Sequence, residues 1–318
     1  MADVTVLAWL NDAGIYRDAI IEAGLDDAVT FAACTDGETP APELLAAADA
    51  LLAWKVPPGA LRQMPRLRWI QALTVATDGW LRRDDLSSDV ALTCARGVHA
   101  VQMPENILGV LLHITRGFAQ IAAHQAERRW TRVVAEPLAG KTLGLVGLGA
   151  VGAEVAARAG AFGMRVIGTR AVPAPVAGVD RVYAPDQLDR MLAEADFVVL
   201  LAPVTPATVD LIDADRLGKM KRSAWLLNFA RGELVVDRDL IDAVTNGVIR
   251  GAVLDVFRTE PLPADDPLWS VPGITILPHI GGLHPERNVL VSALLVENLK
   301  RFLAGSPFKA LVNRDKGY

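Results

Sequence analysis

Three ionisable side chains each follow an apolar segment in the C-terminal half of the chain. Arg231 ends the run AWLLNFAR, Glu260 lies just beyond GAVLDV, and His279 directly follows ITILP. An arginine can hold a carboxylate and polarise a carbonyl, and an imidazole can give a proton to the carbonyl oxygen near neutral pH. A carboxylate beside the imidazole favours its protonated form and fixes its orientation. Together the three types predict the reduction of a 2-keto acid.

Each of these residues alone has a simpler interpretation. An arginine after a strand is often part of a structural ion pair, and a lone histidine is more often a core imidazole than a catalyst. Their occurrence after successive apolar segments favours a shared site, because the C-terminal ends of parallel strands lie at one edge of the sheet. We therefore predict Arg231, Glu260 and His279 as catalytic residues, with Arg231 and His279 also in contact with substrate and cofactor.

A glycine-rich turn precedes these segments. The stretch TLGLVGLGAVGAEVA places Gly147, Gly149 and Gly152 in GxGxxG spacing between an apolar strand and a helix. The first glycine permits the tight turn, the second lets the backbone approach a pyrophosphate, and the third lets helix and strand pack closely. The helix N-terminus attracts the anion. This context predicts a dinucleotide site, with a plain glycine-rich turn as the alternative.

The strand after this turn ends in Thr169 and Arg170, where an NAD site has an acidic residue for the ribose 2′-hydroxyl. A carboxylate would repel a 2′-phosphate, whereas a guanidinium attracts it and can bind it with two hydrogen bonds. NADP(H) is therefore favoured over NAD(H). The alternative is an exposed Arg170 that stacks over adenine, since no second basic residue follows closely and Arg181 is further along the chain.

Two series of strands and helices must position these residues. The first hundred residues alternate β-rich and helical runs, VTVLAWL, YRDAIIEAGL, VTFAAC, ELLAAA, ADALLAW and LRWIQAL, which is typical of parallel βα units. One long helix is predicted over 104–130, as a bridge to the second series, and a last helix over 285–304 is expected to return to the first domain. The second series has predicted strands at 142–147, 164–169, 197–203, 224–230, 251–256 and 274–279, and predicted helices at 153–162, 187–193 and 238–244. The fold class is α/β with two doubly wound parallel sheets.

Composition narrows the class of protein. The 318 residues are 52% apolar and 22% charged, which is enough for two ordered domains. The net charge of -5 and the absence of a Lys/Arg block argue against a nucleic-acid partner. The N-terminal segment and the short apolar runs predict a cytoplasmic protein without a membrane span. Cys34 and Cys94 lack metal-like spacing, so we expect buried free thiols and no metal site.

The motifs GLGAVG, NFARGELV, GAVLDVFRTEPLPADDPLW and ILPHIGG resemble, in order and spacing, those of the D-isomer-specific 2-hydroxyacid dehydrogenases. The resemblance implies a homodimer in which a Rossmann-type NAD(P)-binding domain, 103–283, is inserted in a flavodoxin-like substrate domain, 1–102 and 284–318. It also implies that the arginine, glutamate and histidine form the family's triad. Within the family, ALLAWKVPPGAL and VQMPENILGVLLHITRGF look like the glyoxylate/hydroxypyruvate reductase A branch, whose members favour NADPH.

The resemblance gives further residues a role at the cofactor. Asp255 would bond the nicotinamide carboxamide, Ala150 and Val151 would lie on the pyrophosphate, and Gly281 would border the nicotinamide. The full set of expected cofactor contacts is Gly147, Gly149, Ala150, Val151, Gly152, Thr169, Arg170, Pro203, Thr208, Ala230, Arg231, Asp255, His279 and Gly281.

The expected substrate turn departs from the family pattern. Family members have a Gly-Val-Asp turn whose amides bind the substrate carboxylate, and the matching run LTVATDGW has Ala76 and Thr77 instead. Both are predicted substrate contacts, with Ala76 altering the fit and Thr77 adding a hydroxyl. His284 either caps a helix or contacts substrate. Trp54 and Lys55 either line the cleft or are a core tryptophan and a solvated lysine.

The sequence thus predicts an enzyme that reduces small 2-keto acids such as glyoxylate or hydroxypyruvate to D-2-hydroxy acids with NADPH. The alternative is a dinucleotide-sensing, corepressor-like module, which we disfavour because no long polar tail follows the last helix before Tyr318. Formate oxidation would be expected to place glutamine at Glu260.

Overall fold

The computed structural model describes residues 4–317, which divide into two compact units. Unit 1 comprises Met1–Val98 and His284–Tyr318, and unit 2 comprises His99–Leu283. The sequence predicted domain boundaries after residue 102 and before residue 284, and the two compact units divide after Val98 and before His284. The helix that begins at Gln102 packs against the helix Ala150–Ala161 of unit 2.

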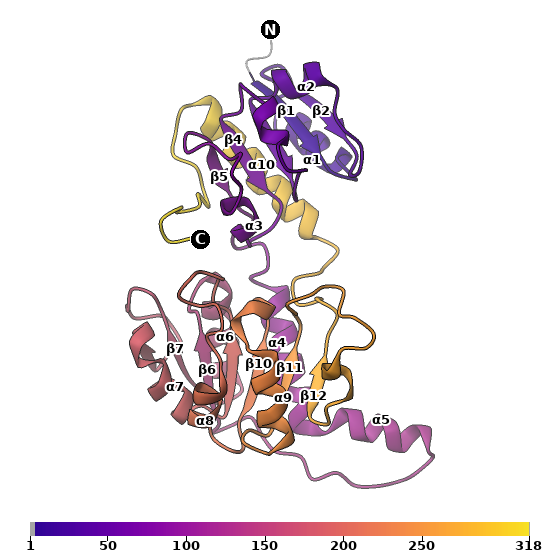
Figure 1. The fold of residues 1–318 in the computed structure, drawn as a ribbon, viewed down its shortest axis with the longest axis vertical. Coiled ribbons are helices and arrows are strands. Elements are labelled where there is room, and N and C mark those ends of the chain that lie inside the picture. The colour runs from indigo at the N-terminus through magenta and orange to yellow at the C-terminus, as the bar shows by residue number, and fades with distance from the viewer. Residues whose placement is uncertain (1–3, 318) are drawn as a thin grey trace. The chain divides into compact units, whose positions relative to one another are not determined.

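Unit 1 is a five-stranded parallel sheet in the order β2-β1-β3-β4-β5. Its strands are β1 Val4–Trp9, β2 Val29–Cys34, β3 Ala50–Ala53, β4 Trp69–Ala72 and β5 Ala91–Thr93. Its helices are α1 Gly14–Glu22, α2 Pro42–Ala47, α3 Asp78–Leu81, α10 Arg287–Leu303 and the short 3₁₀ turn η1 Ala60–Gln63. The C-terminal helix α10 packs against α1 (Figure 1), so the chain does return to its first sheet as predicted.

Unit 2 is a seven-stranded parallel sheet in the order β12-β11-β10-β9-β6-β7-β8. Its strands are β6 Thr142–Val146, β7 Arg165–Thr169, β8 Arg181–Tyr183, β9 Phe197–Leu200, β10 Trp225–Asn228, β11 Gly251–Leu254 and β12 Ile274–Ile276. Its helices are α4 Gln102–Arg116, α5 Phe118–Ala126, α6 Ala150–Ala161, α7 Leu188–Glu194, α8 Ala214–Lys219 and α9 Asp237–Thr245, with 3₁₀ turns η2 Pro185–Gln187, η3 Gly232–Leu234 and η4 Pro267–Ser270. The strand order reverses between β6 and β9, which is where doubly wound sheets bind ligands.

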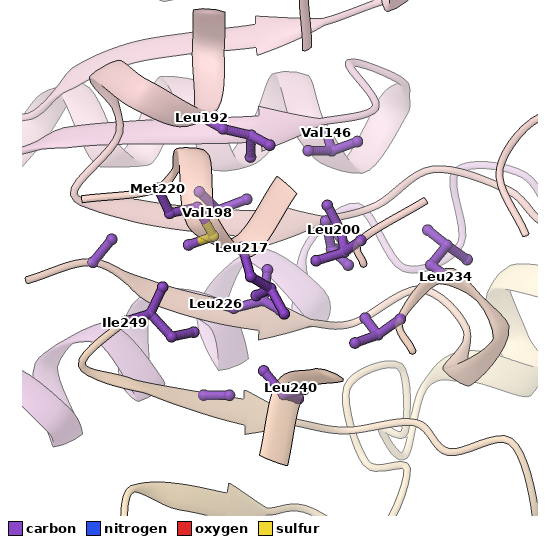
Figure 2. Close-up of a cluster of buried hydrophobic side chains, with 14 of the residues drawn as sticks. Val146, Leu192, Val198, Leu200, Leu217, Met220, Leu226, Leu234, Leu240 and Ile249 are labelled. Carbon is purple, nitrogen blue, oxygen red and sulfur yellow. The ribbon is translucent and has the colours of Figure 1, made fainter. Parts of the chain in front are cut away.

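Apolar side chains fill both faces of the unit 2 sheet. One cluster joins β6, β9 and β10 to helices α7, α8 and α9, and the other joins the opposite face to α4 and α6. Figure 2 shows the first cluster and labels Val146, Leu192, Val198, Leu200, Leu217, Met220, Leu226, Leu234, Leu240 and Ile249. Burial on both faces explains the continuous apolar runs in these strands and fixes the positions of their C-terminal ends.

The long helix predicted over 104–130 is wrong. The segment forms two helices, α4 and α5, which break at Gly117, and α5 ends at Ala126. Gly117 has φ 68°, and a Cβ there would lie 2.8 Å from Val133 Cγ1. The apolar spacing continues across the break because each helix has its own apolar positions. Figure 1 shows α5 extending away from the sheet of its unit.

Smaller elements also differ from the sequence prediction. The three-residue β8 and the six-residue α8 were not predicted, because neither is long enough for a periodic pattern. Both cysteines are free, but only Cys94 is buried; Cys34 is partly exposed at the end of β2, so its predicted burial is wrong. Within residues 4–317, no helix has the length and apolar character needed to cross a bilayer.

Candidate active site

The predicted catalytic residues follow three neighbouring strands of unit 2. Arg231 follows β10, Glu260 follows β11 and His279 follows β12. These strands pair in parallel, with Leu254 of β11 opposite both Asn228 and Ile276. All three side chains therefore belong to loops at the same edge of the sheet, as the sequence predicted.

Glu260 and His279 are in direct contact. The Oε2 atom of Glu260 lies 2.6 Å from Nδ1 of His279. The other carboxylate oxygen, Oε1, accepts a hydrogen bond from the Phe257 amide at 2.9 Å. The His279 side chain is 49% exposed and that of Glu260 is 35% exposed, so the pair is held in place yet open to a ligand. The Glu260 carboxylate thus holds the imidazole by Nδ1, and Nε2 is the ring nitrogen that can face a ligand.

Asp255 holds the loop that carries this histidine. Its two carboxylate oxygens accept hydrogen bonds from the Ile280 and Gly281 amides, both at 2.8 Å. His279 has φ 54°, an uncommon backbone conformation for a residue with a side chain, so the loop needs such support. A Cβ at Gly281 would lie 2.6 Å from Asp255 Oδ2. Burial raises the pKa of Asp255, and the two amide hydrogen bonds act against this shift.

Asn228 closes the turn that carries the arginine, a residue the sequence reasoning missed. Its side-chain amide donates to the Arg231 carbonyl at 2.8 Å, and its Oδ1 accepts from the Ala230 amide at 3.1 Å. A polar residue inside the apolar run AWLLNFA was the available signal. Arg231 Nη1 also donates to the Ala230 carbonyl at 2.6 Å.

Gly232 explains why glycine follows the arginine. A Cβ at this position would lie 2.1 Å from the carbonyl carbon of Phe257 and 2.3 Å from the amide nitrogen of Arg258. The turn of the arginine therefore packs directly on the backbone that leads to Glu260. No side chain fits between the two loops.

The glycine-rich turn has the tight bend predicted at Gly147 and the close packing predicted at Gly152. Gly147 has φ 109°, and a Cβ there would lie 2.8 Å from the Ala202 amide nitrogen. A Cβ at Gly152 would lie 2.7 Å from the Gly147 carbonyl oxygen. Apart from its two chain neighbours, no other residue of 4–317 has an atom within 4 Å of a Cβ built at Gly149, which precedes α6. The open space at this helix N-terminus fits a pyrophosphate group.

Arg170 lies directly after β7, whose last residue is the buried Thr169. Its amide donates to the Tyr183 carbonyl at 3.1 Å, and the residue is exposed. Arg181 lies 3.9 Å from Glu194, which also pairs with Arg165 at 2.9 Å, and 4.6 Å from the centre of the Tyr183 ring, so its guanidinium faces these side chains. This arrangement leaves Arg170 as the basic residue at the end of β7.

The loop after β9 contains two further predicted cofactor residues, Pro203 and Thr208. The Thr208 hydroxyl donates to the Pro203 carbonyl at 2.7 Å and accepts from the Thr205 amide at 2.7 Å. Thr208 thus closes this loop.

Among residues 4–317, no group of three or more His, Cys, Asp or Glu side chains is arranged to hold a metal ion.

The predicted substrate turn lies in unit 1, after β4. The Ala76 amide donates to the Thr74 hydroxyl at 3.1 Å, so the amide expected for a carboxylate already has a partner within the turn. Thr77 is buried, precedes α3, and accepts at its carbonyl from Trp80. The His284 carbonyl accepts from the Arg287 amide at 3.3 Å, and α10 has no side-chain cap.

A family model described as D-isomer specific 2-hydroxyacid dehydrogenase, NAD binding domain, matches residues 108–281. The chain belongs to this family. It is similar to glyoxylate/hydroxypyruvate reductase B of Escherichia fergusonii, at 34% identity over 85% of this chain and 86% of the relative. Among solved structures, a D-isomer specific 2-hydroxyacid dehydrogenase family protein from Aeromonas salmonicida has a TM-score of 0.89 at 32% identity, covering 99% of this chain and 100% of that one. A family member from Xanthobacter autotrophicus Py2, in complex with NADPH and MES, has a TM-score of 0.88 at 30% identity and full coverage of both chains.

Membership of the D-isomer specific 2-hydroxyacid dehydrogenases confirms the predicted enzyme class, an NAD(P)-dependent 2-hydroxyacid dehydrogenase with a two-domain α/β fold. The comparisons do not assign the chain to one branch of the glyoxylate/hydroxypyruvate reductases. Curated relatives carry the name reductase B, whereas the motifs resemble branch A. An NADPH-dependent glyoxylate/hydroxypyruvate reductase from Sinorhizobium meliloti, at 24% identity and a TM-score of 0.85 over 99% of this chain and 100% of that one, shares the fold. Branch A stays a prediction.

Proposed function

We propose that this dehydrogenase reduces 2-keto acids of the glyoxylate and hydroxypyruvate class to D-2-hydroxy acids, with NADPH as the cofactor. The observation that carries the proposal is the contact of 2.6 Å between Glu260 and His279, at the sheet edge that also carries Arg231. When bound, a nicotinamide dinucleotide supplies the hydride.

The three residues divide the remaining chemistry. Because Nδ1 of His279 faces Glu260, its Nε2 is the atom that gives a proton to the carbonyl oxygen. Glu260 orients the imidazole through its contact with Nδ1. Arg231 binds the substrate carboxylate and polarises the carbonyl.

The acid role is tested by His279→Ala, with His113→Ala as the matched control. His113 is a partly buried histidine of α4. We expect His279→Ala to lower kcat by about 10²-fold or more while NADPH affinity stays close to that of the parent enzyme. Thermal unfolding shows whether each variant is folded. An unchanged kcat in a folded His279→Ala variant would remove the histidine from the mechanism.

Arg170 supports NADPH as the cofactor, because its guanidinium would bind the 2′-phosphate. The glycine-rich turn, with Ala150 and Val151 at the start of α6, would hold the pyrophosphate, and Asp255 would accept from the carboxamide. The relative with NADPH bound supports the same choice. Arg170→Asp should shift the ratio of kcat/KM for NADPH over NADH towards NADH. An unchanged ratio contradicts the phosphate contact.

A panel of 2-keto acids, assayed with NADPH and NADH in parallel, tests the reaction itself. The corepressor-like alternative predicts cofactor binding without turnover of any keto acid in the panel. Reduction of glyoxylate or hydroxypyruvate with NADPH is the expected result. The cytoplasmic location stays a prediction.

The homodimer fits the apolar surface of α5 and the segment that follows it. Phe118 is 50% exposed, Ile121 43%, Trp130 96% and Val134 97%. Exposed apolar residues gathered on one segment are typical of a protein interface, and we propose a second copy of this chain as the partner. Trp130→Asp should reduce the mass in solution from dimer to monomer. A parent protein that is monomeric at micromolar concentration would refute the assignment.

A further inference from the structure

Asn106, a residue of α4, binds the backbone of the loop that carries His279. Its side-chain Nδ2 donates to the Gly281 carbonyl at 2.9 Å and to the Ile280 carbonyl at 3.2 Å. Asn106 lies 174 residues before Ile280 in the sequence, yet both belong to unit 2. A carbonyl oxygen accepts and cannot donate, so both bonds depend on the NH₂ group of the asparagine side chain.

The same two loop residues are held on their amide side by Asp255. Its carboxylate oxygens accept from the Ile280 and Gly281 amides, both at 2.8 Å. Asp255 is 1% exposed and directly follows β11. Ile107, which follows Asn106 in α4, is fully buried in the apolar cluster that joins this helix to the sheet. The loop is therefore held from a strand end on one side and from a packed helix on the other.

His279 directly precedes this doubly held segment. Its amide donates to the Leu277 carbonyl at 3.0 Å, which makes a tight bend, and its φ is 54°. A residue with a side chain keeps such a conformation only where the surrounding structure holds it. The direction of the imidazole therefore depends on where the peptides that follow it are fixed.

The type of residue at position 106 gives little to the helix itself. Asparagine lies here inside α4, Gln102–Arg116, although it has a poor helix propensity, because its side chain competes for backbone hydrogen bonds. The two carbonyls that Asn106 binds belong to the loop after β12 and not to its own helix. Residues that break a local rule in this way concentrate at functional sites.

We propose that Asn106 is a positioning residue for the proton transfer, which acts by holding Ile280 and Gly281 so that His279 keeps its orientation. In this orientation Nδ1 meets Glu260 and Nε2 can face a ligand. The inference rests on the proposed function and adds a residue to that site. A misplacement of about 1 Å can cost about 10²-fold in rate. Because Asp255 still holds the two amides, the loss of Asn106 should cost less than the loss of His279.

Substitutions at Asn106 test this role with glyoxylate and NADPH. Asn106→Ala should lower kcat about 10-fold and leave the KM for glyoxylate within about twofold of the parent value, since proton transfer belongs to the transition state. Asn106→Asp has nearly the same shape but places an oxygen where the donor was, so its kcat should be at least as low. Asn106→Gln retains the amide donor and should lose less than Asn106→Ala.

A double-mutant cycle separates positioning of His279 from a purely structural role. In the His279→Ala background, Asn106→Ala should change the remaining kcat by less than about twofold, because the group that it positions is gone. A residue that only stabilises the fold would lower activity by the same factor in both backgrounds. Thermal unfolding shows whether each variant is folded at the assay temperature.

Asn246→Asp is the matched control. Asn246 follows α9 in the same unit, and its Nδ2 also donates to a backbone carbonyl, that of Asp242, at 2.8 Å. The substitution therefore removes the same kind of hydrogen bond at a different place. This variant should keep the kcat and the KM of the parent enzyme.

Two results would overturn the inference while the proposed function stands. They are a folded Asn106→Asp variant with the kcat of the parent enzyme, and a loss from Asn106→Ala that is equally large in the His279→Ala background. If Asn106→Asp does not fold, Asn106→Ala provides the first comparison. A parent enzyme that reduces neither glyoxylate nor hydroxypyruvate with either cofactor overturns the proposed function, and this inference with it.

Discussion

Replacing Gly232 by alanine should disable the site without removing any catalytic side chain. The new Cβ would lie 2.1, 2.3 and 2.5 Å from the carbon, nitrogen and oxygen of the peptide between Phe257 and Arg258. Gly232 is not among the residues with positive φ, so the cause is contact and not backbone strain. All three contacts are with backbone, which cannot rotate away as a side chain can.

The size of the effect follows from these distances. An ordinary contact begins near 3.4 Å, so one loop must move by about 1.3 Å relative to the other. One loop carries Arg231 and the other leads to Glu260. A misplacement of about 1 Å can cost about 10²-fold in rate, and forced overpacking costs about 1–3 kcal/mol of stability. For a unit of this size, about 2 kcal/mol corresponds to a fall in Tm of roughly 4–8 °C.

Thermal unfolding and steady-state kinetics of Gly232→Ala measure both effects. The matched control is Gly160→Ala, because a Cβ at Gly160 of α6 would have no other atom of residues 4–317 within 4 Å beyond its chain neighbours and the backbone of its own helix. This control should keep its activity and gain about 0.5–1 kcal/mol of stability from the better helix former. A Gly232→Ala variant with the Tm and kcat of the parent protein would show that the two loops do not pack as described.

Three further substitutions test other parts of the structure. Burial raises the pKa of Asp255, so the folded state keeps the proton on its carboxyl group to a higher pH than the unfolded chain does. The free energy of unfolding should therefore fall as the pH rises from about 4 through the raised pKa. Urea unfolding of Asp255→Asn across that range should lack this part of the pH dependence, and identical profiles would contradict it. Gly147→Ala, with φ 109° and a Cβ 2.8 Å from the Ala202 nitrogen, should weaken NADPH binding about 10-fold by calorimetry, and unchanged affinity would refute the tight turn. Gly117→Ala should lower Tm by about 2–4 °C, because φ 68° and the contact with Val133 both oppose a side chain, whereas a rise would support the continuous helix.

The sequence predicted that Arg231, Glu260 and His279 follow neighbouring strands at one sheet edge, because parallel strands buried on both faces are continuous apolar runs. A charge after such a run marks a strand end, and the ends of parallel strands share one edge. Arg231, Glu260 and His279 needed only this reasoning. The contact between Glu260 and His279 then followed from the adjacency of β11 and β12.

The same reasoning could not predict contacts between residues that are far apart in the sequence. The sequence showed Gly232 only as the residue that follows Arg231. Glycine is needed there because the backbone of Phe257 leaves no room for a side chain, and no local sequence pattern reveals that contact. Asp255 was expected at the carboxamide, yet both its oxygens also bond the backbone after His279. The break at Gly117 was different, since a glycine after a basic last turn is a known helix stop and outweighs apolar periodicity.

The glycine-rich turn and the three predicted catalytic residues all belong to unit 2. Each unit has its own apolar core, so a change in a unit 1 loop does not alter the Glu260–His279 contact through packing within unit 2. Substitutions at Glu260 should lower kcat for every 2-keto acid, because its carboxylate contacts the His279 imidazole. The strand ends that precede Arg231, Glu260 and His279 are rigidly related, because these strands share hydrogen bonds and buried side chains.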